Sequence, residues 1–95
     1  MKKTVNIIIP VYNVAKYLER CMNSLIHQTY NNIRIIFIDD GSTDNSGKIC
    51  DEYANLYENV HVLHKTNGGV SSARNAGLDY VSRISSGGVY SFHRS

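Results

Sequence analysis

The sequence predicts an α/β fold in which a mainly parallel β-sheet is flanked by helices in a Rossmann-like arrangement. Three short apolar runs alternate with longer segments whose apolar residues recur at helical spacing, and this alternation is typical of βαβ units. The second run is apolar almost throughout, as expected for a strand that is buried on both faces. A chain of 95 residues is long enough for one small domain of this kind.

The first predicted strand covers residues 4–10 and should end near Pro10, which has no backbone N–H to extend a ladder. The helix after it is predicted from apolar residues at i, i+3 and i+4 spacing, which lie on one buried face. These residues are Leu18, Cys21, Met22, Leu25 and Ile26. We expect the first strand to be central in the sheet.

The second predicted strand covers residues 33–38. The helix after it should begin near Thr43 or Asp44, because either residue is a good N-cap, and its apolar face extends to Tyr57.

A third strand is predicted over residues 60–64 and a third helix over residues 71–82. Residues 1–81 therefore form one predicted βαβαβα domain. The remaining residues, 82–95, are a Ser/Gly-rich tail in which residues 89–92 could form a short strand.

Composition excludes several classes of function. The net charge is only +2 and the basic residues are scattered, so we expect no nucleic-acid partner. No run approaches the ~20 apolar residues of a membrane span, and the run at residues 5–11 is too short and too interrupted for a signal peptide. Cys21 and Cys50 lie in predicted amphipathic helices, which favours buried reduced thiols and a cytoplasmic location over a disulfide.

Polar and aromatic residues follow the first two predicted strands at the point where each strand ends. Asp39 and Asp40 come directly after the second strand, and Pro10, Tyr12 and Asn13 lie at the end of the first. In an open parallel sheet, ligands bind in the crevice beyond the carboxyl ends of the strands. These residues are therefore expected at the mouth of a ligand site.

Four segments together resemble the amino-terminal nucleotide-binding half of the family 2 glycosyltransferases. They are "TVNIIIPVYN", "SLIHQTY", "DDGSTD" and "NGGVSSARNAGLDY", in this order within residues 3–80. The resemblance implies the GT-A fold, truncated here to its nucleotide-binding half, and an inverting enzyme that uses a nucleotide-sugar donor, most often a UDP-sugar.

The resemblance also implies which residues bind the donor nucleotide. In the family, the second acid of the pair accepts a hydrogen bond from the base, which assigns this role to Asp40. Independently of the resemblance, the place of Tyr12 just after the strand-ending proline favours stacking on the base, and Arg74, on the helix after the glycine loop, could offer its guanidinium to the diphosphate. The full predicted site is Pro10, Val11, Tyr12, Asn13, Asp39, Asp40, Gly41, Asn67, Gly68, Gly69 and Arg74.

Each of these residues also has a purely structural interpretation. Asp39 and Asp40 could cap the next helix, where each would contribute about 0.3 to 1 kcal/mol. Tyr12 could be a core aromatic, Asn13 a turn or N-cap residue, and Arg74 the partner of a surface acid. The glycine pair is common in turns for backbone reasons alone.

Other nucleotide folds and a histidine metal site fit less well. The position of a dinucleotide-binding G-x-G-x-x-G reads "PVYNVA", and neither a P-loop nor the acid pattern of a receiver domain is present. His61 and His64 would face opposite sides of one strand, so they should not share a metal ion.

The tail lacks a motif that the resemblance would lead one to expect. Family members continue into a fourth strand that ends in a metal-binding D-x-D, whereas no carboxylate follows Asp79 here. We therefore expect Mg²⁺ or Mn²⁺ in a full-length enzyme, with its ligands and the general base absent from these residues, and no catalytic residue among them. The missing strand would leave a sheet edge unpaired and open to self-association. A noncatalytic nucleotide-binding remnant or interaction module is the alternative.

Overall fold

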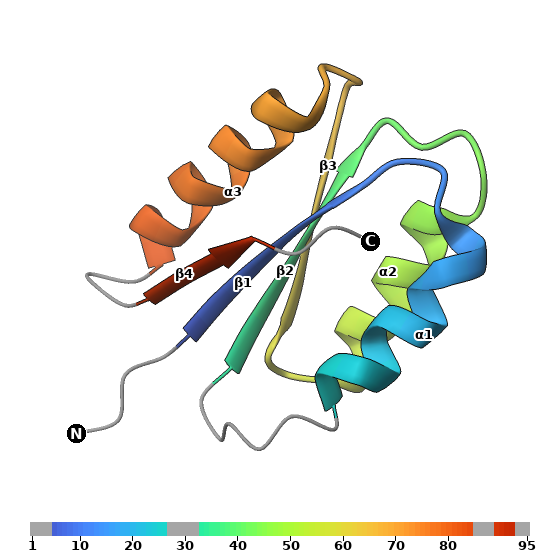
Figure 1. The fold of residues 1–95 in the computed structure, drawn as a ribbon, viewed down its shortest axis with the longest axis horizontal. Coiled ribbons are helices and arrows are strands. Elements are labelled where there is room, and N and C mark those ends of the chain that lie inside the picture. Colours follow the sequence, from blue (N-terminus) through green and yellow to red (C-terminus); the bar gives the residue numbers. More distant parts are fainter. Residues whose placement is uncertain (1–4, 27–32, 85–88, 93–95) are drawn as a thin grey trace.

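The computed structural model describes residues 5–26, 33–84 and 89–92, which form a parallel four-stranded sheet with helices on both faces. In Figure 1, α3 lies on one side of the strands and α1 and α2 lie on the other. The elements are β1 (Val5–Val11), α1 (Ala15–Ile26), β2 (Ile33–Asp40), α2 (Ser46–Leu56), β3 (Val60–Lys65), α3 (Val70–Ile84) and β4 (Val89–Phe92). The predicted α/β, Rossmann-like fold is confirmed.

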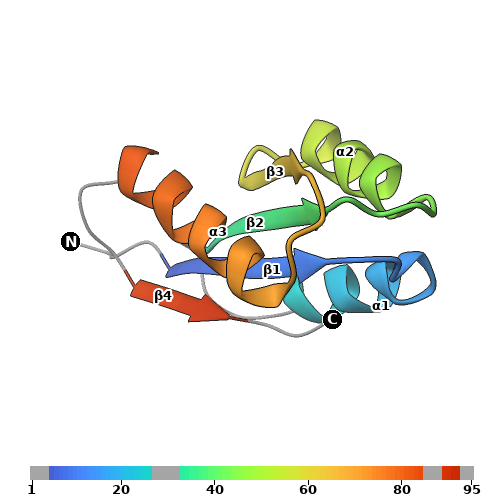
Figure 2. The same cartoon turned by 90° about the horizontal axis from the view of Figure 1, so that it is seen from above.

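The strand order is β3-β2-β1-β4, so β1 is an interior strand, as predicted. Figure 2 shows β4, β1 and β2 side by side with their arrowheads pointing the same way. The pairing of β1 with β2 continues to Val11 opposite Asp39, one residue beyond the predicted end. Pro10 removes only one donor, and the residues on either side of it continue the pairing.

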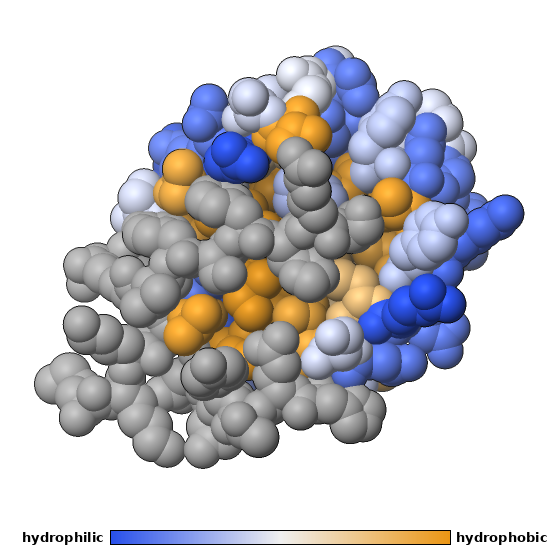
Figure 3. Space-filling model, in the orientation of Figure 1, coloured by the Kyte–Doolittle hydropathy of each residue, from blue (hydrophilic) through white to orange (hydrophobic). Residues whose placement is uncertain are grey.

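Two apolar clusters hold the helices to the sheet, one on each face. Alternate residues of β1 and β2, including Ile9 and Phe37, pack against α1 and α2, whereas Ile8 and Ile36 pack against α3. Burial of β2 on both faces, expected from its continuous apolarity, is confirmed. On the side of the molecule shown in Figure 3, hydrophobic residues are visible in the middle and hydrophilic residues lie along the top and right of the view.

A glycine allows α3 to approach the sheet closely. A Cβ added at Gly77 would overlap Cγ2 of Ile8. The low helix propensity of glycine is thus accepted where a larger residue would push α3 away from β1.

Helix boundaries differ from the sequence prediction at α2 and α3. The N-cap of α2 is Asn45, so the prediction of Thr43 or Asp44 is wrong by one or two residues. Asp44 instead accepts a hydrogen bond from the N–H of Ser46 at 2.9 Å. Tyr57 is the extended C-cap of α2 rather than part of the helix. α3 begins one residue earlier and ends two residues later than predicted.

The expectation of an unpaired edge beside β1 is wrong. β4 pairs with β1 in parallel from Val5 opposite Val89 to Ile8 opposite Phe92. The short strand considered possible at residues 89–92 therefore forms, with the same bounds, beside an interior strand of the sheet. Within the described sheet, the outer strands are β3 and β4.

Three further expectations concern the cysteines, membrane spans and two segments of the chain. Cys21 and Cys50 are buried free thiols, as predicted. Among the described residues, no helix combines the length and the apolarity needed to cross a bilayer. Residues 27–30 of the "SLIHQTY" motif and residues 93–95 of the tail lie outside the described residues.

Candidate functional site

The carboxyl ends of β1, β2 and β3 meet at one edge of the sheet, which we call the carboxyl edge. Three loops leave the strands there: residues 12–14, 41–45 and 66–69. Because the three strands are parallel and paired in register, their last residues lie side by side. Most of the predicted site residues belong to this edge or to its loops.

Asp40 is the last residue of β2, and its carboxylate is almost fully buried, with 4% of the residue exposed. Its Oδ1 accepts hydrogen bonds from Lys65 Nζ at 2.8 Å and from the backbone N–H of Gly68 at 2.9 Å. Its Oδ2 accepts one from the N–H of Gly69 at 2.8 Å. A carboxylate has about four acceptor positions, so these bonds leave one, on Oδ2, for a ligand.

These contacts keep Asp40 ionised. Burial raises the pKa of Asp40, but the hydrogen bonds from Lys65, Gly68 and Gly69 outweigh burial and hold the pKa below its ordinary value. The carboxylate is therefore an acceptor at neutral pH. Its contacts lie with the loop before α3, so it does not serve as a cap of α2.

Asp39 lies beside Asp40 but faces the opposite side of the sheet. Its Oδ1 accepts the N–H of Ser42 at 3.0 Å, and its Oδ2 lies 2.8 Å from His64 Nδ1. Burial raises the pKa of Asp39, and the hydrogen bonds from Ser42 and His64 more than compensate, so that it lies below the ordinary value. These contacts make Asp39 a residue that orders the 41–45 loop.

His64 bridges two carboxylates. Its Nδ1 faces Asp39, and its Nε2 lies 2.8 Å from Asp51 Oδ1 on α2. The two hydrogen bonds to Asp39 and Asp51 raise the pKa of His64 above its ordinary value, although burial acts in the opposite sense. A protonated imidazole can donate to both acids at once, which ties β3 to β2 and α2.

Asn13 joins two loops of the carboxyl edge. It has a positive φ of 51°, which asparagine tolerates better than most residues. Its Oδ1 accepts the N–H of Thr43 at 2.7 Å and the N–H of Asp44 at 3.2 Å. These contacts agree with the structural interpretation of Asn13 as a turn residue.

The 41–46 segment also caps α1. Ser42 Oγ accepts the N–H of Asn13 at 3.2 Å, Ser46 Oγ that of Val14 at 2.9 Å, and Asp44 Oδ2 that of Ala15 at 3.2 Å. The first N–H groups of a helix have no partner within the helix. Asp44 supplies the partner of Ala15, the first residue of α1, and the two serines bind the residues just before the helix, so much of the "DDGSTD" motif holds the scaffold together.

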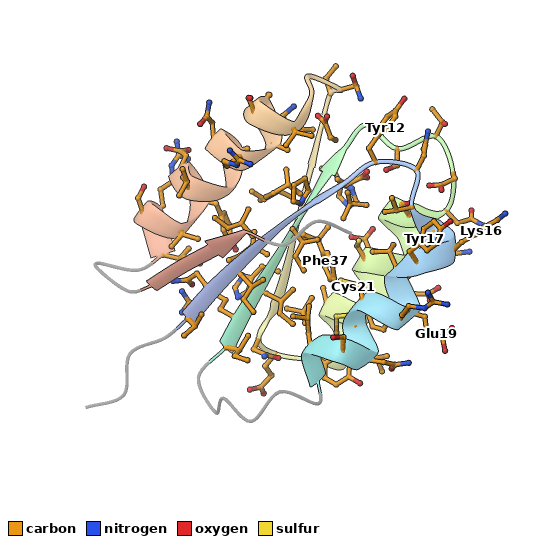
Figure 4. The ribbon with its side chains drawn as sticks, viewed as in Figure 1. Tyr12, Lys16, Tyr17, Glu19, Cys21 and Phe37 are labelled. Atoms are coloured by element: carbon orange, nitrogen blue, oxygen red, sulfur yellow. The ribbon has the colours of Figure 1, made fainter. Side chains whose placement is uncertain are left out.

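Tyr12 and its neighbours form the other side of the carboxyl edge. Tyr12 is 50% exposed, while Val11 is fully buried and Pro10 half-buried. Figure 4 shows Tyr12 beyond the end of β1, away from Phe37 in the core. The exposed ring excludes the interpretation of Tyr12 as a core aromatic and leaves a face open to a planar ligand.

The loop of residues 66–69 packs tightly against the end of β2. Asn67 Nδ2 donates to the carbonyl of Asp40 at 3.0 Å. Gly41 has a φ of 72°, and a Cβ there would lie 2.7 Å from the backbone N of Asn67. Position 41 therefore requires glycine for both backbone conformation and close approach.

Arg74 lies on the second turn of α3 and is exposed. α3 begins at the carboxyl edge, and the assignment of Arg74 to a diphosphate stays a prediction.

Lys65 was not among the predicted site residues, and His64 was predicted only not to share a metal ion with His61. The acids of β2 stand directly opposite them, with Asp39 beside His64 and Asp40 beside Lys65. The adjacent "DD" and "HK" pairs at two strand ends were a usable signal, but only once the register was known. The prediction that His61 and His64 face opposite sides is confirmed, since His61 contacts Tyr80 of α3 at 2.6 Å.

The described residues do not fit a divalent cation. They contain no group of three or more His, Cys, Asp or Glu side chains placed to hold a metal ion. The two acids at the carboxyl edge bind Lys65, His64 and backbone N–H groups instead. A hard cation would have to displace these partners.

Comparison with known proteins agrees with this geometry. The sequence model of Glycosyl transferase family 2 matches residues 6–83. Glycosyltransferase GlyG of Streptococcus pneumoniae is 47% identical over 79 residues, which cover 82% of this chain and 26% of GlyG. The chain thus spans about a quarter of the length of that relative.

Two solved structures share the fold. Residues 1–349 of Staphylococcus aureus TarS in complex with UDP superpose with a TM-score of 0.79 at 30% identity, covering 97% of this chain and 27% of that 1–349 chain. The mannosyltransferase PcManGT of Pyrobaculum calidifontis, solved with GDP-Man and Mn²⁺, gives a TM-score of 0.69 at 21% identity over 84% of this chain and 25% of PcManGT. At that identity the second likeness bears on the fold alone.

Proposed function

The chain belongs to glycosyl transferase family 2, and from this premise we propose that it forms the donor-nucleotide site of an inverting glycosyltransferase that uses a UDP-sugar. The observation that carries the proposal is the carboxyl edge. There, a buried ionised carboxylate with one acceptor position left lies among the loops that the family resemblance assigns to the nucleotide. The solved complex of TarS with UDP, 30% identical, supports the choice of nucleotide.

In this proposal the ligand contacts are divided among the three loops. Asp40 accepts a hydrogen bond from the N–H of the base through Oδ2, and Tyr12 stacks on the base with its exposed ring. The backbone of residues 67–69 approaches the nucleotide closely. Arg74 contacts the diphosphate, because a guanidinium pairs well with phosphate oxygens.

Asn13 and Asp39 hold the loops in place rather than contact the ligand. Both use their acceptor atoms within the protein, Asn13 on the N–H groups of Thr43 and Asp44, and Asp39 on Ser42. Pro10 and Gly41 complete the wall of the site, and Val11, which is fully buried, supports that wall from the core.

A full-length enzyme would also need a divalent cation, Mg²⁺ or Mn²⁺, which would neutralise the negative charge on the leaving diphosphate. Because the described residues do not fit such an ion, no step is assigned to it in this chain. No catalytic residue is assigned here either, and the sugar and the acceptor are left open.

The test of the proposal is UDP binding by the wild type and by Asp40→Asn, measured by calorimetry. The substitution replaces one carboxylate oxygen, an acceptor, by an NH₂ group, a donor. The hydrogen bond that is lost, to a charged group, contributes about 1.5 to 3 kcal/mol. We therefore expect UDP binding to weaken by about this amount.

The matched control is Asp79→Asn. Asp79 pairs with Arg83 on the exposed surface of α3, with 63% of its side chain exposed, and the same chemical change there should leave UDP affinity unaltered. A wild type that does not bind UDP overturns the proposed function, and an unchanged affinity in Asp40→Asn removes Asp40 from the site.

A further inference from the structure

β2 and β3 end in two matched pairs of opposite charge. Asp39 stands opposite His64, and Asp40 stands opposite Lys65. Because successive residues of a strand point to opposite faces, the first pair lies on the side of α2 and the second on the side of the loop that leads into α3. The two acids therefore have separate partners.

Lys65 makes the better-buried pair of the two. Its side chain is 22% exposed, compared with 49% for His64. Its Nζ donates to Asp40 Oδ1 at 2.8 Å and to the carbonyl of Thr66 at 2.6 Å. One ammonium thus joins the end of β2 to the first residue of the 66–69 loop.

The same loop returns to Asp40 through its later residues. The N–H groups of Gly68 and Gly69 donate to the two oxygens of the carboxylate. Lys65, the loop and the carboxylate thus form a closed set of contacts, in which Oδ2 keeps its remaining acceptor position. Removing one partner of a buried ion pair leaves an uncompensated charge, so the set depends on the ammonium.

We propose that Lys65 is a positioning residue of the nucleotide site: its ammonium fixes the Asp40 carboxylate and the 66–69 loop in the arrangement that receives the base. The inference rests on the proposed function, because it assigns to Asp40 the ligand that the proposal gives it. Lys65 acts through Asp40 and not on the base itself.

A readout specific to this role is the pH at which UDP binding fails in acid. Burial raises the pKa of Asp40, and Lys65 is the charged side chain in contact with Asp40 that opposes this effect, together with the N–H groups of Gly68 and Gly69. The neighbouring acid, Asp39, points to His64 instead. Without the ammonium, Asp40 should take up a proton at a higher pH and lose its ability to accept.

The experiment is calorimetric titration of wild type, Lys65→Met, Lys65→Gln and Asp40→Asn with UDP between about pH 5 and pH 8. UDP also titrates in this range, so each affinity is divided by that of Asp40→Asn, which has no carboxyl at position 40. Arg83→Met is the control for loss of one positive charge, since Arg83 lies on the last turn of α3 with 75% of its side chain exposed.

We expect Lys65→Met to weaken UDP binding about tenfold near pH 7.5, the scale of one charged hydrogen bond. The UDP affinity of Lys65→Met, divided by that of Asp40→Asn, should then fall further as the pH is lowered toward about 5. Over the same pH range the corresponding ratio for the wild type should not change. Lys65→Gln retains an N–H donor without the charge, so it should show the same acid shift, and it carries the test if Lys65→Met does not fold. Arg83→Met should follow the wild type.

Two outcomes separate this inference from the proposed function. In the first, the wild type binds UDP and Asp40→Asn weakens binding, but both Lys65 variants match the wild type in affinity and in the pH at which binding fails in acid. The positioning role is then overturned and the function stands. If the wild type does not bind UDP, the function itself is overturned. The inference is also overturned if both Lys65 variants bind UDP more weakly but lose binding in acid at the same pH as the wild type, because this indicates general loosening of the loop.

Discussion

His61 and His64 lie three residues apart on β3, and their pKa values are shifted in opposite directions. The hydrogen bonds to Asp39 and Asp51 raise the pKa of His64, whereas burial, and then the positive charge of Arg34, lower the pKa of His61. A raised pKa adds stability that is fully present below the ordinary value of about 6.5 and is lost as the pH rises through the folded-state pKa. A lowered histidine pKa has the opposite effect, because the folded state loses stability as the pH falls below the ordinary pKa of about 6.5.

We expect His64→Gln to remove a pH-dependent part of the stability. The difference in melting temperature between wild type and variant should be largest below about pH 6.5 and should shrink as the pH rises above it. Thermal unfolding followed by circular dichroism from weakly acidic to weakly alkaline pH measures it.

The control is His61→Gln on the same strand. Its difference from the wild type should change with pH in the opposite direction. Equal slopes for both variants would contradict the assigned shifts.

At the residue scale, the sequence was informative about which side chains matter and less so about what they contact. An acid pair after an apolar strand was sufficient to place Asp39 and Asp40 at the carboxyl edge. Their partners lie 25 residues further on, and strand register decides that pairing. Lys65 was missed for this reason.

The helices of this protein depend on loops that are distant in sequence. The N–H group of the first residue of α1 and those of the two residues before it bind oxygens of Ser42, Asp44 and Ser46, and Asn13 returns bonds to the same loop. The βα loops after β1 and β2 therefore stabilise each other. Local propensity alone predicted an N-cap at residue 43 or 44, whereas in the structure Thr43 binds Asn13 and Asp44 binds the first N–H group of α1.

We expect Ser46→Ala to destabilise the fold by about 1 to 2 kcal/mol, since it removes an acceptor from a helix N-terminus and leaves a partly buried N–H of Val14 without its partner. Ser46 is fully buried and its Oγ lies 2.9 Å from that N. Urea unfolding measures the loss. Ser24→Ala, at an exposed position of α1, should change stability by less than about 0.5 kcal/mol, and equal effects at both positions would argue against the cap.

At the scale of the whole molecule, this chain covers only part of the length of its relatives. It spans about a quarter of GlyG and a similar share of the TarS chain. The family resemblance assigns metal ligands and the general base to later segments of such enzymes. Within the described residues, no acid or histidine cluster suits a metal ion.

We therefore expect the 95-residue chain alone to bind UDP without transferring sugar. General base catalysis by itself typically contributes about 100- to 10,000-fold, and the leaving diphosphate would lack charge neutralisation. Donor hydrolysis and transfer assays with Mg²⁺ or Mn²⁺ and several nucleotide-sugars test this. Metal-dependent turnover above a control without protein would contradict it.

Self-association through a sheet edge stays a prediction, but its place changes. β4 covers β1 from Val5 to Ile8, so the edges available in the described sheet belong to β3 and β4. The short strand considered possible in the Ser/Gly-rich tail forms as β4, where the interior strand β1 offers its backbone groups.

The sequence by itself determined the fold class, the order of strands and helices, and the edge of the sheet where the site lies. These follow from apolar periodicity and from the abrupt polar ends of strands, which are local properties. The tertiary structure alone decided the pairing of Asp40 with Lys65, of Asp39 with His64, and of the two βα loops with each other. Such contacts join residues at least 25 positions apart, and they exist only because parallel strands in fixed register place those residues side by side.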